Sequence, residues 1–315
     1  GEVPAPEFPA GADSLDTAAA LVADGDANTA AALDLSALYE KLLQKRNYAL
    51  GAVDKENIRR LYGRKLRLSA SQVDKQAQCR LSYFLRYGLR AKERKEATVD
   101  PAEFGTYVHA VLEHTAKTVM EMGGFHQVSL EQTMSIAMEY SDQYTAQRFS
   151  QLDSERMTYL FKRNVRELAM VVEELWQELS TSEFVPVGFE VAFGDGGQMD
   201  AIDIPNGAMP AQLRGFVDRV DSWNNGYTNY FRVVDYKTGR KDFDYCDVFN
   251  GIGLQLLLYL FALEDGGETV LGQRSKPAGV QYFPARVPYI SLDGAQESEE
   301  KDRRANWKRR GLLLY

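Results

Sequence analysis

The spacing of apolar residues changes once along this chain, near Pro186. Before that residue apolar side chains recur at helical intervals. After it they form short runs rich in β-branched and aromatic residues, divided by turns that contain Gly or Asn. Three of these runs are expected to be strands: 187–193, 213–223 and 230–236. A buried helix is expected at 254–263 and another strand near 280–283, so the pattern predicts an α/β core with a helical extension.

Helix signals mark the first half of the chain. Asp100 is the expected cap of the clearest helix, because Pro101 suits a first turn and Glu103 completes a capping box. Apolar residues continue in this helix through Val119. Further helices are expected in four segments: 36–62, from a cap at Ser69 or Ser71 through Cys79 to Gly88, about 129–149, and about 153–180.

The composition separates a short tail from one large domain. Residues 1–35 are rich in Ala, Asp, Gly and Pro with little apolar periodicity, and we expect them to be a loosely ordered linker. Residues 36–315 are expected to form the domain, helical to about residue 185 and α/β from about 186 to 290. A chain of 315 residues that is 44% hydrophobic can fill a core of that size.

Neither a membrane span nor a disulfide framework is indicated. The longest apolar run, 254–263, is far shorter than the roughly 20 residues of a spanning helix. The N-terminus lacks a secretory signal, so a cytoplasmic protein is expected. Cys79 and Cys246 are far apart and form no CxxC pair, so both are expected to be reduced thiols, with Cys246 a small core residue.

The net charge of −8 is unevenly distributed. Residues 1–40 hold eight acidic residues and no Lys or Arg, which leaves the remainder neutral with 37 of each sign. Within that remainder, 59–96 holds twelve basic residues against three acidic ones, and 301–310 holds six against one. Both segments are candidate phosphate-contact surfaces, with a solvated helix face as the alternative.

The segment Arg232-Val-Val-Asp-Tyr-Lys-Thr-Gly239 ends an apolar strand in a carboxylate followed two positions later by an ammonium group. Residues i and i+2 of a strand share a face, so Asp235 and Lys237 are expected to project into one pocket. There the carboxylate can hold a hard cation and the lysine can orient a water molecule. A lone D-x-K is more often a surface ion pair, so its context decides.

The preceding strand, Leu213-Arg-Gly-Phe-Val-Asp-Arg-Val-Asp221, delivers a second carboxylate, Asp218. If the two strands pair as a hairpin across Asn224-Asn-Gly226, Asp218 and Asp235 lie near each other. Two buried carboxylates repel unless a cation joins them, and Mg²⁺ or Mn²⁺ with such ligands would supply an activated water. This equipment suits phosphodiester hydrolysis, in which charge builds on phosphoryl and leaving oxygens.

Four other short motifs accompany the two aspartates: Gln78-Cys-Arg-Leu-Ser-Tyr-Phe-Leu-Arg-Tyr-Gly88, Gly105-Thr-Tyr-Val-His109, Gly188-Phe-Glu-Val-Ala-Phe193 and Leu254-Gln-Leu-Leu-Leu-Tyr259. In this order the motifs resemble those of the PD-(D/E)XK nucleases, in particular the RecB-like branch and the C-terminal nuclease domain of AddB-type helicase–nuclease subunits. The resemblance covers about 61–283. It implies a restriction-endonuclease-like mixed β-sheet core flanked by helices.

The resemblance also implies roles for individual residues. His109 is expected to bind the metal together with Asp218 and Asp235. Glu190 would be a further carboxylate ligand, although a strand glutamate that faces solvent is nearly as good an interpretation. Gln255 and Tyr259 lie one helical turn apart, where they can hydrogen-bond near Lys237 or to DNA, or can simply pack in the core.

Cys79 matches the first of four cysteine ligands that hold a 4Fe–4S cluster in this family. Here Arg80 and Leu81 follow it, where relatives usually have proline and an aromatic residue. The other three cysteines would follow the catalytic core, and the chain reaches Tyr315 without them. We therefore expect a chain truncated before the cysteine group, or a natural loss of it, and a cluster that cannot be completed here.

The implied function is a metal-dependent DNA exonuclease domain of an ATP-dependent helicase–nuclease, active in double-strand break processing and recombinational repair. The partners would be DNA, as single strands, and an AddA-type subunit. Tyr83, Phe84 and Tyr87 could stack on bases, or could equally pack within a helix. The alternatives are a noncatalytic binding or scaffolding module and a different metal hydrolase on the same fold. No nucleotide-binding phosphate loop is present, so ATP binding is not expected.

Overall fold

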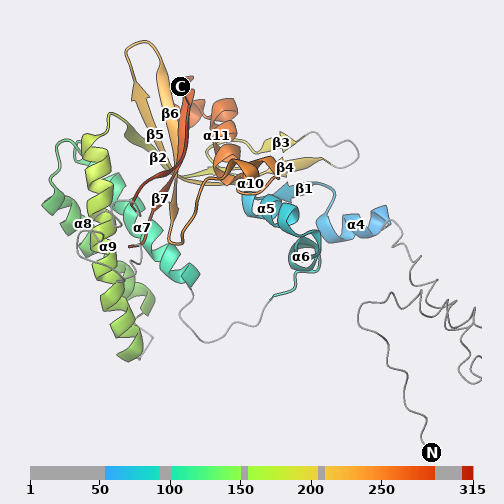
Figure 1. Ribbon diagram of the computed structural model, residues 1–315, viewed down its shortest axis with the longest axis horizontal. Coiled ribbons are helices and arrows are strands. Elements are labelled where there is room, and N and C mark those ends of the chain that lie inside the picture. The colour runs from blue at the N-terminus through green and yellow to red at the C-terminus, as the bar shows by residue number, and fades with distance from the viewer. Residues whose placement is uncertain (1–53, 93–100, 150–154, 205–209, 288–306, 315) are drawn as a thin grey trace, which may run out of the picture. The chain divides into compact units, whose positions relative to one another are not determined.

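The computed structural model describes residues 54–92, 101–149, 155–204, 210–287 and 307–314, with the backbone alone at 101–102, 148–149 and 155–164. Statements about structure below refer to these residues. The chain divides into two compact units, 1–58 and 59–315. Of the first unit only the beginning of one helix is described. All the other elements lie in the second unit, and Figure 1 labels the elements along the chain.

The helices, in chain order, are α4 (Lys55–Tyr62), α5 (Ala70–Gln78), α6 (Arg80–Tyr83), the π-helix η1 (Phe84–Gly88), α7 (Pro101–Glu121), α8 (Leu130–Phe149), α9 (Glu155–Thr181), α10 (Tyr245–Phe249), α11 (Gln255–Gly266) and α12 (Glu268–Leu271). The strands are β1 (Leu66–Leu68), β2 (Val185–Phe193), β3 (Ile202–Ile204), β4 (Ala211–Leu213), β5 (Gly215–Asn224), β6 (Asn229–Lys237), β7 (Lys276–Pro284) and β8 (Arg310–Leu313). None of the described helices is long and apolar enough to cross a membrane.

The main sheet has five strands in the order β2-β5-β6-β7-β8. Strands β2, β5 and β6 pair antiparallel, β6 and β7 pair parallel, and β8 returns antiparallel along β7. The sheet is therefore mixed, which confirms the predicted α/β class. Because β6 is the central strand and is covered on both faces, four consecutive residues, 233–236, are buried.

Two apolar cores lie on opposite faces of this sheet. Helices α7, α8 and α9 pack on the face that presents Val234 and Tyr236, and α11 packs on the face that presents Val233 (Figure 1). The alternation of neighbouring strand residues between faces explains why adjacent residues belong to different cores. A smaller sheet, β1-β4-β3, adjoins the α11 side through Leu213.

Most of the predicted elements are confirmed. The helices expected at 101–119, 129–149, 153–180 and 254–263 correspond to α7, α8, α9 and α11, and the strand near 280–283 corresponds to β7. Ser69 rather than Ser71 caps α5, in a capping box with Gln72. The capping role of Asp100 and most of the expected helix 36–62 lie outside the described residues, as does the predicted linker.

Three predictions were wrong. The helix expected to run from Ser69 to Gly88 breaks at Cys79, whose extended φ of −160° ends α5, while its Sγ accepts a hydrogen bond from the Ser82 amide at the start of α6. The strand expected at 213–223 is two strands, since Leu213 ends β4 in the small sheet and β5 begins at Gly215. Cys246 is exposed on α10 and is not a core residue.

Candidate metal and catalytic site

The β5–β6 hairpin places the two predicted aspartates opposite each other. Arg219 pairs with Val234 in the register of the two antiparallel strands, so Asp218 and Asp235 are the next cross-strand neighbours. Asp235 alternates with Val234 and therefore lies on the face of β6 that also presents Val233, the face that α11 covers. This confirms the hairpin geometry expected from the sequence. Burial, and after it the field of Asp235, raises the pKa of Asp218 well above its usual range.

Asp235 and Lys237 form the expected same-face pair. The Lys237 Nζ atom lies 2.5 Å from Asp235 Oδ2, and the Asp235 side chain is 1% exposed. Apart from this ion pair, neither carboxylate oxygen has a hydrogen-bond partner among the described residues. Burial raises the pKa of Asp235 even though the lysine opposes that shift. A buried carboxylate with spare oxygens is the kind of group that a hard cation satisfies.

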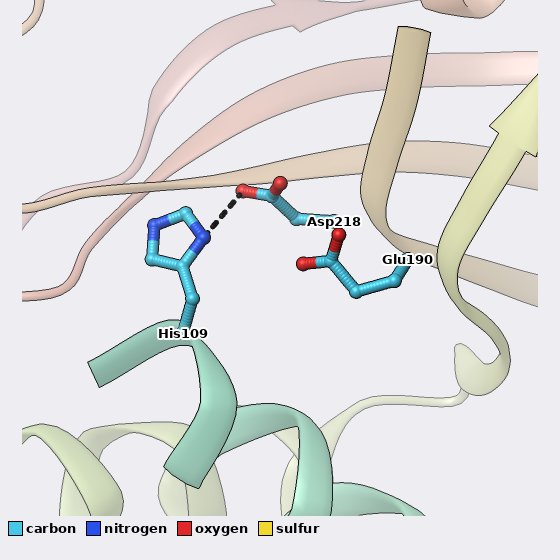
Figure 2. Close-up of side chains that lie close together, drawn as sticks. All are labelled: His109, Glu190 and Asp218. Atoms are coloured by element: carbon cyan, nitrogen blue, oxygen red, sulfur yellow. Dashed lines mark ion pairs between the residues drawn. The ribbon is translucent and has the colours of Figure 1, made fainter. Parts of the chain in front are cut away.

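Beside this pair, three side chains from three elements converge: His109 of α7, Glu190 of β2 and Asp218 of β5 (Figure 2). One ligand atom of each lies within 4.8 Å of the other two. Asp235 is not a member of this close group, although the sequence placed it with His109 and Asp218. Glu190 is in the group, although the sequence allowed a solvent-facing position for it nearly as well.

The orientation of His109 is fixed through its far nitrogen. Nε2 lies 2.9 Å from the carbonyl oxygen of Tyr236, which can only accept, so Nε2 carries the proton and donates. Burial lowers the pKa of His109, which favours the neutral ring. Nδ1 then presents its lone pair 3.6 Å from Asp218 Oδ2. Both atoms can donate a lone pair to a cation, so a cation bound between them would be favourable.

Tyr236 supports the site through its backbone, a role that sequence reasoning missed. Its carbonyl accepts from His109, and its amide donates to Asp218 Oδ2 at 2.7 Å. Both neighbours of Tyr236 in sequence, Asp235 and Lys237, belong to the site. Its side chain is on the opposite face, where Arg219 Nη1 donates to the hydroxyl at 3.3 Å. Backbone contacts leave no residue signature, so only the folded chain reveals them.

Glu190 adopts a backbone conformation that is rare for a residue with a side chain. Its φ is +45°, in the left-handed region that glycine prefers, although it lies inside strand β2. Burial and the nearby Glu113 raise the pKa of Glu190. Residues held in this region cost of order 1 kcal/mol or more and gather at functional sites. The strain is consistent with a backbone bent to aim this carboxylate at His109 and Asp218.

Helix α11 supplies a chain of hydrogen bonds that ends on Lys237. Lys237 Nζ donates to Gln255 Oε1 at 3.2 Å, and Gln255 Nε2 donates to the Tyr259 hydroxyl at 3.0 Å. The sequence expected these two side chains near Lys237, and the structure confirms that proximity. The amide of Leu254, just before α11, donates to Asp74 Oδ1 of α5 at 3.3 Å, so α5 holds the start of this helix in place.

The remaining predicted residues lie apart from this cluster. Cys79 is exposed at the α5–α6 junction, and Cys246 is the only other cysteine of the 315 residues. Tyr83 stacks on Tyr62 with ring centroids 6.0 Å apart and also contacts Tyr87. These contacts favour the packing interpretation of the aromatic residues over a surface for base stacking.

The fold and the site together define a nuclease class, and comparison with known proteins agrees. The family described as the PD-(D/E)XK nuclease superfamily matches residues 67–310, and the chain belongs to that superfamily. Members of this class use divalent metal ions.

Among curated proteins, the chain is similar to three that are each named as a subunit of an ATP-dependent helicase/deoxyribonuclease. The protein from Clostridium novyi (strain NT) is 33% identical over 274 residues, which is 84% of this chain and 24% of that protein. Those from Ruminiclostridium cellulolyticum (34% over 281 residues; 86% and 24%) and Moorella thermoacetica (35% over 268 residues; 83% and 23%) are comparable. The chain therefore spans about a quarter of the length of these relatives.

Proposed function

We propose that this chain is a metal-dependent deoxyribonuclease domain that hydrolyses phosphodiester bonds, with Mg²⁺ or Mn²⁺ as the ion. The observation that carries the proposal is the convergence of His109, Glu190 and Asp218 beside the Asp235–Lys237 pair. Family membership supports nuclease chemistry. A scaffold would have no use for a strained glutamate, a buried carboxylate with spare oxygens and a lysine aimed at it.

The ligand atoms suit a hard divalent ion. Carboxylate oxygens and one neutral imidazole are present, and water molecules would complete an octahedron. Asp235, which lies next to Asp218 across the hairpin, would join the other ligands because its oxygens are otherwise unsatisfied. When bound, such an ion offsets charge on the phosphoryl oxygens and lowers the pKa of a water molecule.

Three further side chains have roles that follow from their contacts. Lys237 is close enough to Asp235 to orient a water molecule or to offset charge that develops on the phosphate. Gln255 holds the lysine, and Tyr259 holds Gln255. His109 keeps its Nδ1 lone pair free for the ion because Tyr236 fixes the Nε2 proton.

The names of the relatives suggest that the domain acts within a larger helicase–nuclease complex. They describe an ATP-dependent helicase and deoxyribonuclease. We propose that this domain acts as an exonuclease on single strands delivered by an AddA-type helicase partner, during double-strand break processing and recombinational repair. A 4Fe–4S cluster does not fit this chain on its own, because four thiolates are needed and the sequence has two cysteines.

Cleavage of end-labelled single- and double-stranded DNA in Mg²⁺ or Mn²⁺ tests the proposal. Asp235→Ala is expected to abolish cutting, whereas the matched control Asp265→Ala, an exposed aspartate on α11, is expected to cut as the unchanged chain does. Label at either end distinguishes exonuclease ladders from internal cuts. Folded chains that bind DNA but never cut it would favour the noncatalytic module, and equal cutting by Asp235→Ala would refute the assigned site.

A further inference from the structure

A strongly basic cavity adjoins the candidate catalytic site. Its volume is about 380 Å³, and three separate segments form its walls: the loop after β6, the end of β7 and the region around the start of β8. Six cationic side chains line it: Lys237, Arg240, Lys241, Arg286, Lys308 and Arg310. Among the described residues, none of those that line it is acidic. Since these cations come from segments as far apart in sequence as Lys237 and Arg310, the fold and not one charge run brings them together.

The cations of this cavity are only partly neutralised. Lys237 pairs with Asp235, and Arg286 lies 3.5 Å from Glu167. The other two arginines share one carboxylate: Asp242 forms ion pairs with Arg310 at 2.8 Å and with Arg240 at 3.4 Å.

The other two cations have no such partner. Within the described part of the chain, neither Lys241 nor Lys308 has a carboxylate within 4.0 Å. Together with the shared Asp242, this leaves an excess of about three positive charges at the cavity when the described residues are counted. Like charges gathered at one place repel one another, so the arrangement favours a polyanion as its ligand.

The size and position of the cavity indicate which kind of polyanion it can bind. Its volume is that of a site for a single small ligand, which admits a strand's phosphates but not a whole duplex. Lys237 belongs both to the cavity wall and to the ion pair with Asp235, so the cavity adjoins the candidate catalytic site. The charge of Lys241 also reaches the site: burial raises the pKa of Asp235, and Lys241 is among the cations that oppose this shift.

We propose that this cavity binds the backbone phosphates of a single DNA strand next to the bond that is cut, with Lys241 and Lys308 as principal phosphate contacts. The inference rests on the proposed nuclease function and adds where the strand lies. It also gives a purpose to the basic segment near the C-terminal end of the sequence, of which Lys308 and Arg310 are part. Backbone phosphates are anions, so cations that line a cavity beside the reaction centre can contact them.

The test is the salt dependence of binding to fluorescein-labelled dT20 in EDTA, where no cutting occurs. Each phosphate contact contributes a slope of about 0.7 in log affinity against log salt for single strands. The double variant Lys241→Ala/Lys308→Ala is expected to lower that slope by about 1.4 and the affinity by about tenfold or more at low salt. Arg274→Ala/Lys276→Ala removes two exposed cations at the other end of β7 and is expected to change neither.

A charge-preserving variant, Lys241→Arg/Lys308→Arg, is expected to retain most of the affinity, which separates loss of contact from loss of folding. An unchanged slope in the Ala double variant, an equal loss in the control pair, or no binding of dT20 by the unchanged chain would each overturn the inference. The outcome is independent of cleavage. Lost binding in a chain that never cuts would uphold the cavity and reject the nuclease, and cutting with an unaffected slope would do the reverse.

Discussion

Glu190 shows how a single residue can be placed against its own backbone preference. Its φ of +45° within β2 is unfavourable for any residue with a Cβ atom, yet it brings the carboxylate into the group with His109 and Asp218. Strain of this kind persists only where surrounding structure enforces it, here by pairing β2 with β5 on either side of the residue. We interpret this backbone strain as the energetic cost of placing the Glu190 carboxylate where it can bind a metal ion.

Substitutions at Glu190 test that interpretation. In a strand, a protein with glycine is normally less stable than the same protein with alanine. At a left-handed position glycine is instead the more stabilising residue, by about 1 kcal/mol in the free energy of unfolding. Glu190→Gly is therefore expected to be more stable in urea unfolding than Glu190→Ala. Both are expected to weaken metal binding, measured by calorimetry. A more stable alanine variant would show that the backbone at this position is not left-handed in solution.

The two hydrogen bonds that link Lys237 to Gln255 and Gln255 to Tyr259 predict that substitutions lower activity more, the nearer they are to Lys237. Gln255→Ala removes a hydrogen bond to a charged group and is expected to lower kcat about tenfold, with little change in KM. Tyr259→Phe removes only the outer bond and is expected to cost about threefold. Steady-state cleavage of a labelled oligonucleotide measures both, and a larger effect in Tyr259→Phe would contradict this order.

At the scale of elements, a buried ion network joins α9 to the face of the sheet that presents the Tyr236 side chain. Glu178 of α9 accepts from Arg219 at 2.6 Å, from Arg232 at 3.2 Å and from Arg309 at 2.6 Å. Arg219 is fully buried and also contacts the Tyr236 hydroxyl. The network therefore joins a helix, two strands and the segment before β8 behind the residue that holds His109 and Asp218.

Stability is expected to depend on pH through Glu178. Burial alone would raise its pKa, but Arg219, Arg309 and Arg232 outweigh burial and hold the pKa at about 2. A carboxyl whose pKa is depressed by folding stabilises the fold above its unfolded pKa of roughly 4.3, and this contribution fades as pH falls toward 2. Glu178→Gln should cost on the order of 3 kcal/mol near pH 7.

Urea unfolding between pH 3 and 7 measures this effect. The difference between the unchanged chain and Glu178→Gln is expected to be constant above about pH 5 and to shrink below pH 4. Glu173→Gln, an exposed glutamate on the same helix, is the matched control and is expected to show no such window. A difference that stayed constant across the whole range would contradict the assigned ion network.

At the scale of the whole molecule, the candidate site exists only where α7, β2, β5 and β6 meet. Three acidic groups and a neutral histidine lie together, so the folded state without a cation carries repulsion that the unfolded chain avoids. An ion that binds only the folded state adds stability, about 2.7 kcal/mol at a concentration 100 times Kd. Metal should thus act on folding as well as on chemistry.

Thermal unfolding with and without Mn²⁺ tests this coupling. The unchanged chain is expected to gain about 5 °C or more in Tm at saturating ion, and EDTA should reverse the gain. Asp218→Asn is expected to be at least as stable as the unchanged chain in EDTA, because repulsion falls while Asn can still accept from the Tyr236 amide. Its Tm should not respond to Mn²⁺, and an equal response would exclude Asp218 as a ligand.

Local patterns in the sequence determined the elements and most of the site chemistry. Periodicity located the helices and the central strands, while the apolar run before Asp235-x-Lys237 placed that pair on one face. The hairpin spacing brought Asp218 to Asp235. These features follow from neighbours in sequence, since strand alternation and helical turns are local regularities. The break at Cys79 and the exposure of Cys246 escaped prediction because burial and backbone direction depend on distant packing.

Only the tertiary structure decided which candidate ligand residues come together. Glu190 joins His109 and Asp218, whereas Asp235 stands beside them with Lys237, because β2 bends at a left-handed residue that no pattern signals. The backbone of Tyr236 and the three segments around the basic cavity are likewise invisible in sequence. Contacts between segments tens of residues apart depend on how those segments pack in the folded chain, and no local pattern in the sequence specifies that packing.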